Sequence, residues 1–139
     1  MGTPSDADPG AAAYSYLRLY NDQSGDSHFE DVEFPFDELD GPFSPPVLAT
    51  PFQEATHHGV RIVPPGWERD WAPAARRMIA VYLSGEGEIE ASDGEVRRLL
   101  PGMVLLAEDT IGRGHRVKLI GDEPVKVIHI VLPDSPRIG

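Results

Sequence analysis

The sequence predicts an antiparallel all-β sandwich or barrel, and three observations favour this fold class. The middle of the chain holds four short strand-like runs, at residues 78–84, 86–91, 95–100 and 103–107. Turn residues separate these runs, and the Asp93-Gly94 pair supplies the positive-φ positions that a tight hairpin needs. No segment shows a long helical pattern. Short strands at this spacing are typical of sandwiches and barrels.

The N-terminal part of the chain continues the strand pattern and then becomes rich in proline. Residues 14–20 and 28–36 alternate in side-chain character with a period of two, as strands do. Residues 37–51 contain four prolines and one glycine, which predicts an extended arm rather than a helix. Residues 67–75 show no periodicity and are predicted to form a loop, whereas residues 124–132 are predicted to be the last strand.

These segments divide the chain into four parts. We expect a disordered tail at residues 1–12, N-terminal strands and a proline-rich arm at 13–51, a barrel at 52–133 and a short tail at 134–139. The length of 139 residues suits one domain with a modest core.

Charge and composition exclude several classes of partner. The formal net charge of −11 disfavours nucleic acid and anionic membrane, because an acidic surface repels both. Cysteine is absent, so the chain has neither a disulfide framework nor a thiol nucleophile. The first residues lack the basic region and apolar core of a secretory signal, and no run approaches the ~20 apolar residues of a membrane span. We therefore expect a cytoplasmic protein.

Residues 84–104, SGEGEIEASDGEVRRLLPGMV, resemble the middle of a cupin. The resemblance extends over about residues 58–132. It implies the double-stranded β-helix of that family, a jelly-roll barrel, to which the N-terminal strands and arm are added. Bacterial natural-product pathways use cupins of this size as enzymes, so the resemblance also implies a role of that kind.

The family's first motif, G-x5-H-x-H-x3-E-x6-G, can be placed on this chain without a gap. Gly66 and Gly85 take the two glycine positions. The His, His and Glu that bind metal in other cupins then fall on Ala72, Ala74 and Met78. The resemblance therefore implies a cupin whose metal-binding motif is degenerate.

The second motif, G-x5-P-x-G-x2-H-x3-N, is matched only in part. Gly102 fits its first position, and residues 108–110, Glu-Asp-Thr, replace the P-x-G turn. A histidine arrives two residues late, at His115. The segment is similar to small bacterial cupins whose second motif is roughly L-x-E-D-T-x-G-x-G-H.

A metal site would need a new set of ligands in this chain. About three protein ligands must converge for a catalytic metal. Candidates are His57 or His58, His129, Glu108 and Asp109, but their spacing does not favour a site. We expect no metal and no other cofactor.

Without a metal, the barrel still offers a pocket for a small molecule. If position 78 points inward, as it does in the family, then the period of a strand also turns positions 80, 82 and 84 inward. This predicts a pocket wall formed by Met78, Ala80, Tyr82 and Ser84.

The opposite face of the same strand is apolar as well. Ile79, Val81 and Leu83 would form an exposed apolar strip unless the N-terminal arm or a second subunit covers them. In cupins, N-terminal segments often cross the barrel or reach a partner subunit. The resemblance therefore suggests a homodimer.

Three residues are candidates for catalysis. His115 is predicted as a general acid or base, because an imidazole titrates near neutral pH; the alternative is a loop histidine that only bonds nearby backbone. Tyr82 and Glu108 would polarise an oxygen of the substrate. For Glu108 the alternative is turn chemistry shared with its neighbours.

Further residues are candidates for substrate binding. Trp67 and Trp71 would close over a ligand, or else pack on the barrel or at a dimer interface. Arg61 and Arg76 would each hold a ligand carboxylate, or form a solvated salt bridge. His129 has the opposite parity to an outward Lys126 and is predicted to point inward, as a ligand-binding or a core histidine.

These expectations lead to one function and two alternatives. The first is a metal-independent isomerase, epimerase, cyclase or lyase that acts on an apolar, oxygenated metabolite. The second is a binding or sensing module that uses the same pocket without turnover. The third is a metal-dependent dioxygenase whose ligands have been displaced.

Overall fold

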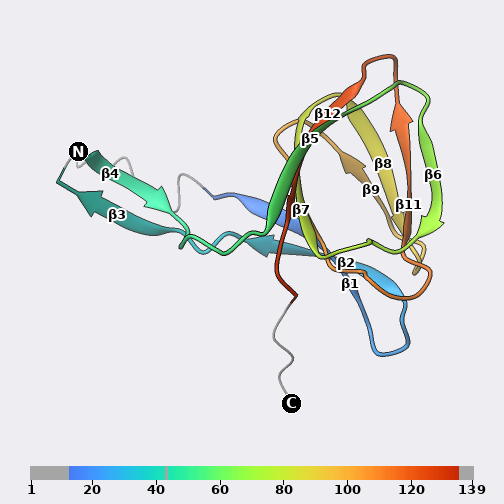
Figure 1. The fold of residues 1–139 in the computed structure, drawn as a ribbon, viewed down its shortest axis with the longest axis horizontal. Coiled ribbons are helices and arrows are strands. Elements are labelled where there is room, and N and C mark those ends of the chain that lie inside the picture. The colour runs from blue at the N-terminus through green and yellow to red at the C-terminus, as the bar shows by residue number, and fades with distance from the viewer. Residues whose placement is uncertain (1–12, 43, 135–139) are drawn as a thin grey trace.

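The computed structural model describes residues 13–42 and 44–134. These residues form twelve β-strands and no helix, so the prediction of an all-β fold is confirmed. No described segment is a helix long and apolar enough to cross a membrane. The strands are arranged in a six-stranded sheet, a four-stranded sheet and a separate two-stranded hairpin (Figure 1).

Eight strands form a barrel of two facing sheets. They are β5 (His57–Val63), β6 (Glu68–Ala72), β7 (Met78–Ser84), β8 (Glu86–Ala91), β9 (Val96–Leu99), β10 (Val104–Ala107), β11 (His115–Ile120) and β12 (Val125–Val131). One half has the order β5-β12-β7-β10 and the other β6-β11-β8-β9, with antiparallel neighbours throughout. This is the strand order of an eight-stranded jelly roll, so the predicted cupin double-stranded β-helix is confirmed.

Two N-terminal strands extend the first half of the barrel. β1 (Ser15–Asn21) lies parallel to β10, with Leu17 opposite Leu105, and β2 (Ser27–Glu33) pairs with β1 in antiparallel fashion. The side chains of Leu17 and Leu19 turn into the barrel and are buried there. These strands therefore contribute to the core as well as to the sheet.

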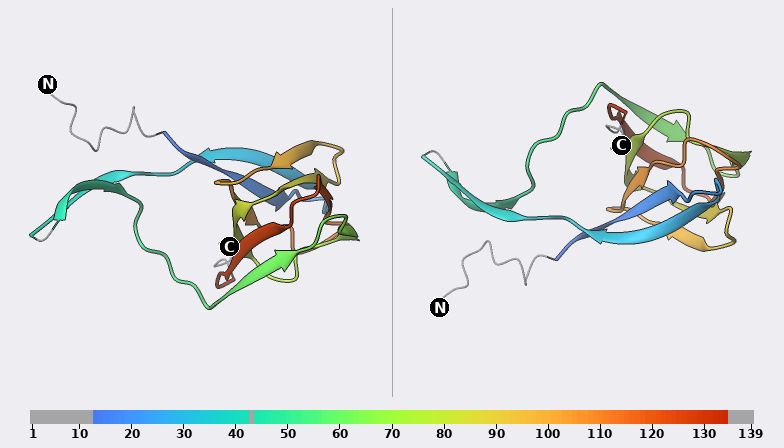
Figure 2. Two further views of the ribbon diagram at one scale, coloured as in Figure 1. Left: turned by 90° about the horizontal axis from the view of Figure 1, so that it is seen from above. Right: turned by 90° about the horizontal axis from the view of Figure 1, so that it is seen from below.

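The segment predicted as an extended arm forms a hairpin that projects from the barrel (Figures 1 and 2). Its strands are β3 (Asp37–Gly41) and β4 (Ser44–Ala49). Every residue of β3 is exposed. At the base of the hairpin, residues 34–35 and 50–53 border a groove on the outer face of the six-stranded sheet, together with Ile79 and Leu106. The base of the arm thus lies beside the outward apolar strip at Ile79, while Leu83 at the end of the strip stays 51% exposed.

The prediction of a loop at residues 67–75 was wrong, because β6 lies within it. β6 pairs with β11 across a register irregularity, with Ala72 opposite His115 and Arg69 opposite Val117. Charged side chains occupy both faces of this strand, so the sequence shows no apolar alternation there. Backbone pairing with β11, rather than side-chain periodicity, defines the strand.

The core fills the barrel only in part. Leu19, Phe29, Ile89 and Leu99 are buried between the sheets. Smaller residues face the remaining interior, and this leaves a cavity between the two sheets.

Candidate functional site

A cavity of about 360 Å³ lies between the two facing sheets, and all eight barrel strands contribute to its wall. This volume is within the range of small-molecule sites. Small side chains such as Ala80 and Ala107, together with Gly87, leave the space open. Most of the wall is apolar. No aspartate or glutamate of the described chain lines it.

His115 is held in the wall by a buried carboxylate. It begins β11 and is 6% exposed, while Asp109, in the loop after β10, is 0% exposed. The Nδ1 atom of His115 lies 2.6 Å from Oδ2 of Asp109. The backbone carbonyl of Asp109 accepts a hydrogen bond from the Ala74 N–H at 3.0 Å, which anchors the loop. The imidazole is therefore fixed in orientation.

The second nitrogen of His115 faces Arg69 on β6. Nη1 of Arg69 lies 3.1 Å from Nε2 of His115, and Nη2 donates to the carbonyl of Pro73 at 3.0 Å. A guanidinium can only donate hydrogen bonds, so Nε2 accepts, and Nδ1 carries the proton that it donates to Asp109. The resting imidazole is therefore neutral, with Nε2 as its basic nitrogen.

His129 reaches the cavity from the opposite sheet. It lies on β12, and its Nδ1 atom is buried without a hydrogen-bond partner among the residues described. Burial, and then the charge of Arg61, lower the pKa of His129, so this imidazole is neutral near pH 7. A buried polar atom without a partner costs about 1–3 kcal/mol. A ligand that supplied the missing partner would recover part of this free energy.

Tyr82 adds a hydroxyl to the apolar part of the wall. It lies on β7, next to the His129-bearing strand β12 in the same sheet, and lines the cavity. Burial raises the pKa of Tyr82, so its hydroxyl stays protonated at neutral pH. It is therefore able to donate a hydrogen bond to an oxygen of a bound molecule.

The structure brings most of the predicted site residues to this one cavity. They are His115, Tyr82, Met78, Ala80, Trp67, Arg61 and His129. The sequence analysis assumes that position 78 points inward, and Met78, Ala80 and Tyr82 do line the cavity. Whether each residue acts on a substrate stays a prediction.

Glu108 is not among the described lining residues. Its carboxylate forms ion pairs with Arg18, at 2.7 Å, and with Arg77. Burial alone raises the pKa of Glu108, but its hydrogen bonds to Arg18 and Arg77 lower it overall. This residue joins β1 to the segment before β7 and has a structural role in the observed geometry.

Three other predicted residues also lie apart from the described lining. Ser84 ends β7 next to a register shift in the pairing with β12, and its buried hydroxyl has no partner in the described chain. The ring of Trp71 packs against the guanidinium groups of Arg113 and Arg116, at 4.0 and 5.1 Å. Arg76 is exposed in the turn before β7.

Two residues of the site were not singled out from the sequence. From the sequence, Asp109 shares with Glu108 and Thr110 the alternatives of a carboxylate base, a hydrogen-bonding rim or turn chemistry, or it is a displaced metal ligand, and Arg69 falls in a predicted loop. The signal for Arg69 was its position between Glu68 and Asp70, since a strand with outward carboxylates turns the residue between them inward. For Asp109 the sequence carried no comparable signal.

The residues present do not fit the metal that metal-binding cupins hold. Ala74 and Met78 occupy ligand positions in the wall, and His115 has Asp109 on one nitrogen and the cationic Arg69 on the other. Within residues 13–42 and 44–134, no three His, Asp or Glu side chains are grouped so as to hold a metal ion.

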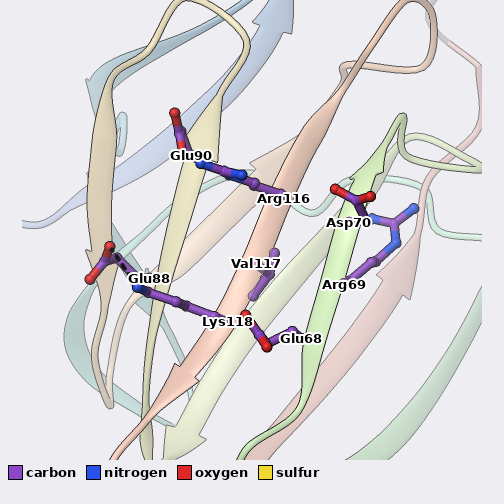
Figure 3. A pocket seen from close by; sticks show the side chains of 8 residues that line it. All are labelled: Glu68, Arg69, Asp70, Glu88, Glu90, Arg116, Val117 and Lys118. Carbon is purple, nitrogen blue, oxygen red and sulfur yellow. Dashed lines mark hydrogen bonds and ion pairs between the residues drawn. The ribbon is translucent and has the colours of Figure 1, made fainter.

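A second depression lies on the outer face of the four-stranded sheet, and charged side chains line it (Figure 3). Two of its cations pair across strands, Arg116 with Glu90 at 2.8 Å and Lys118 with Glu88 at 4.0 Å. Such exposed pairs are typical of a solvated sheet face. The inner cavity is the better candidate for a binding site, because its wall holds the unpartnered Nδ1 of His129 and the buried pair of His115 and Asp109.

No family model and no curated protein matches the chain. Among solved structures, the cupin domain of Schizosaccharomyces pombe Cnp3 is similar over 87% of this chain and 84% of that one, with 17% identity and a TM-score of 0.44. A conserved Streptococcus pyogenes protein of unknown function, SPY1581, is similar over 59% of this chain and 70% of that one, with 19% identity and a TM-score of 0.43. These values say nothing about reaction or ligand.

Proposed function

We propose that this chain is a metal-independent small-molecule enzyme of the isomerase, epimerase, cyclase or lyase type. Its substrate is an apolar, oxygenated metabolite held between the two sheets. The observation that supports this most directly is the buried pair of Asp109 and His115, 2.6 Å apart in the cavity wall. A histidine with one nitrogen fixed by a carboxylate is the common arrangement of a general base.

The chemistry consists of a proton transfer at one nitrogen. His115 takes a proton from a carbon or hydroxyl of the substrate at Nε2, and Asp109 stabilises the imidazolium through Nδ1. The proton then returns to a different atom of the substrate, or it leaves with an oxygen group in an elimination. Tyr82 donates a hydrogen bond to the oxygen on which negative charge develops. The apolar wall holds the reactive conformer.

The test is deuterium incorporation into candidate substrates in D2O. Aromatic ketones, unsaturated ketones and hydroxy acids are incubated with EDTA-treated protein whose metal content has been measured by elemental mass spectrometry. We expect the protein to introduce deuterium into at least one of these substrate classes, at a carbon next to a carbonyl. NMR measures the rate at which the proton signal of that carbon is lost. His115→Gln should slow the labelling by about 10²–10⁴-fold, the usual contribution of a general base.

The matched control is His58→Gln, because His58 lies on the barrel strand β5 but does not line the cavity. It should label at the wild-type rate. Labelling that survives in His115→Gln, or that requires an added metal, would contradict the proposal.

A binding or sensing role is the second candidate, and one observation favours it. Nε2 of His115 accepts a hydrogen bond from Arg69, so the base is not free in the observed geometry. This role predicts a ligand that binds in the cavity and is recovered without deuterium or chemical change.

A further inference from the structure

The cavity wall holds two cations that lack anionic partners. Arg61 and Arg69 both line it, and no ion pair of the described chain joins either of them to a carboxylate. The arginines that do form such pairs lie outside the wall: Arg18, Arg77, Arg97, Arg98 and Arg116. The chain has 23 Asp and Glu against 12 Lys and Arg, yet no carboxylate of the described residues lines this cavity.

Unpaired guanidinium groups in a largely apolar wall favour an anionic ligand. Arg69 is partly buried, and Arg61 is exposed on the edge strand β5. A partly buried charge in a concave site attracts the opposite charge more strongly than a charge on an open surface does. The orphaned Nδ1 of His129, close enough to Arg61 for its pKa to be affected, is a second unsatisfied group in the same wall. Both observations indicate that a ligand with polar atoms completes this site.

We propose that the substrate carries a carboxylate, and that Arg69 is the positioning residue that couples carboxylate binding to the release of Nε2 of His115. This inference rests on the proposed function, because it concerns the same cavity and the same base. It goes further by naming the substrate's charged group and the contact that the substrate must break.

The coupling follows from the two hydrogen bonds of Arg69. Nη1 occupies the Nε2 lone pair of His115, while Nη2 is bound to the carbonyl of Pro73, which keeps the guanidinium at the wall. A carboxylate accepts two parallel N–H bonds from an arginine and outcompetes a neutral imidazole as a partner. When Nη1 turns to the carboxylate, Nε2 is left facing the substrate with a free lone pair. A neutral molecule of the same shape would leave the base occupied.

The experiment compares a carboxylic acid with its neutral amide. The probes are 2-naphthoate and 2-naphthamide, which are flat, apolar and nearly equal in size. Binding is measured by calorimetry, and the side-chain nitrogens of His115 are followed by 15N NMR, with His115→Gln used to assign its signals. We expect the wild type to prefer the acid by about tenfold or more, equivalent to about 1.4 kcal/mol. Only the acid should shift the Nε2 signal.

Three variants separate charge, geometry and general damage. Arg69→Gln should abolish the preference for the acid without weakening the amide. Arg69→Lys keeps the positive charge but loses the planar guanidinium that donates two parallel hydrogen bonds. It should therefore retain a reduced preference for the acid over the amide. Arg98→Gln, on the exposed face of β9, should behave like the wild type. Thermal unfolding of each variant checks that the barrel is intact.

Two results would overturn the inference: equal binding of acid and amide, including no binding of either at millimolar concentration, or an unchanged preference in Arg69→Gln. The proposed function is judged separately. Deuterium labelling of neutral ketones that needs His115 but not Arg69 would sink the inference and leave the function standing. Arg69-dependent binding of the acid without any deuterium labelling would support the inference about Arg69 and contradict the proposed enzymatic function. The chain would then be a binding protein.

Discussion

At the scale of single residues, Asp109 determines which nitrogen of His115 carries the proton. The carboxylate accepts from Nδ1, and Arg69 donates to Nε2, so two neighbours select one tautomer. Oδ1 of Asp109 is buried and has no partner in the described part of the chain. The pair is therefore sensitive to the exact donors and acceptors at position 109.

Asp109→Asn tests this dependence at nearly constant volume. The new amide must either donate to Nδ1, which reverses the tautomer against Arg69, or bury an N–H at the place where Oδ1 has no partner. We expect the free energy of unfolding to fall by about 1–3 kcal/mol in urea titrations at pH 7. Asp70→Asn, on the exposed face of β6, should change it by less than about 0.5 kcal/mol. Equal stability of the Asp109 variant and the wild type would contradict the assignment.

His28 is a second titrating residue with defined partners, outside the cavity. Its Nε2 lies 2.6 Å from Oδ2 of Asp22, and its Nδ1 lies 2.8 Å from Oδ2 of Asp93. The hydrogen bond to Asp22, and after the opposing effect of desolvation the bond to Asp93, raise the pKa of His28 above its ordinary value of 6.5. The protonated imidazole thus ties the β1–β2 turn to the β8–β9 turn.

This arrangement predicts a pH dependence with a definite sign. A histidine whose pKa is raised by folding stabilises the fold fully below its ordinary pKa, and this contribution is lost as the pH rises through the folded pKa. The difference in unfolding free energy between the wild type and His28→Gln should therefore be largest below pH 6.5 and shrink as the pH rises above it. Asp93→Asn should weaken the trend. A difference that grows with pH would refute it.

At the scale of elements, the crossing of β6 and β11 positions the site. Gly114 precedes His115 with φ +76°, and a Cβ atom there would collide with the backbone carbonyl of Ala72. The close approach places His115 opposite Ala72 and brings Arg69 within reach of Nε2. Only glycine combines this backbone conformation with this contact.

Gly114→Ala should therefore destabilise the barrel more than an ordinary change at a positive-φ glycine does. Gly121 is the matched control, with φ +84° and no atom within 4 Å of a built Cβ. Gly121→Ala should cost about 1–2 kcal/mol for the left-handed conformation alone. Urea titration of both variants should show a clearly larger loss for Gly114→Ala. Similar losses of unfolding free energy in the two variants would mean that the backbone at Ala72 can shift away from the added methyl group at little cost.

The strands that could be predicted from the sequence are those with a clear period or a clear turn. Residues 78–84 and 86–91 were predicted with the observed bounds, because Gly85 and the turn after Ala91 delimit them. β6 was missed because its polar side chains hide the period. The parallel pairing of β1 with β10 joins segments far apart in the sequence, so no local pattern reports it.

The same distinction holds for the site. Parity along one strand predicted the inward positions of β7, and parity from Lys126 predicted His129. The contacts of His115 with Asp109 and Arg69 depend on how a loop and a strand from different parts of the chain meet. Glu108, next to Asp109 in sequence, turned instead to Arg18 and Arg77, and no sequence pattern distinguished the two carboxylates.

At the scale of the whole molecule, apolar surface remains exposed on the six-stranded sheet. On its edge strand β5, Val60 and Ile62 are 69% and 67% exposed. The projecting hairpin also exposes apolar residues, with Leu39 at 56% and Val47 at 46%. Two copies related by a two-fold axis would place each hairpin against the other's sheet and cover both surfaces. The homodimer expected from the sequence stays a prediction, and we expect these two surfaces to form its interface.

Sedimentation velocity tests this arrangement. We expect the wild type to sediment with twice the chain mass of 15.2 kDa, and Ile62→Asp to shift the population to the monomer, because a charge on the buried face of an interface is poorly tolerated. Val96→Asp is the control, since Val96 is 45% exposed on β9, in the other sheet. It should leave the dimer intact. A monomeric wild type at high concentration would refute the dimer, and equal loss in both variants would place the interface elsewhere. Neither variant alters the cavity lining, so anion binding should persist in the monomer.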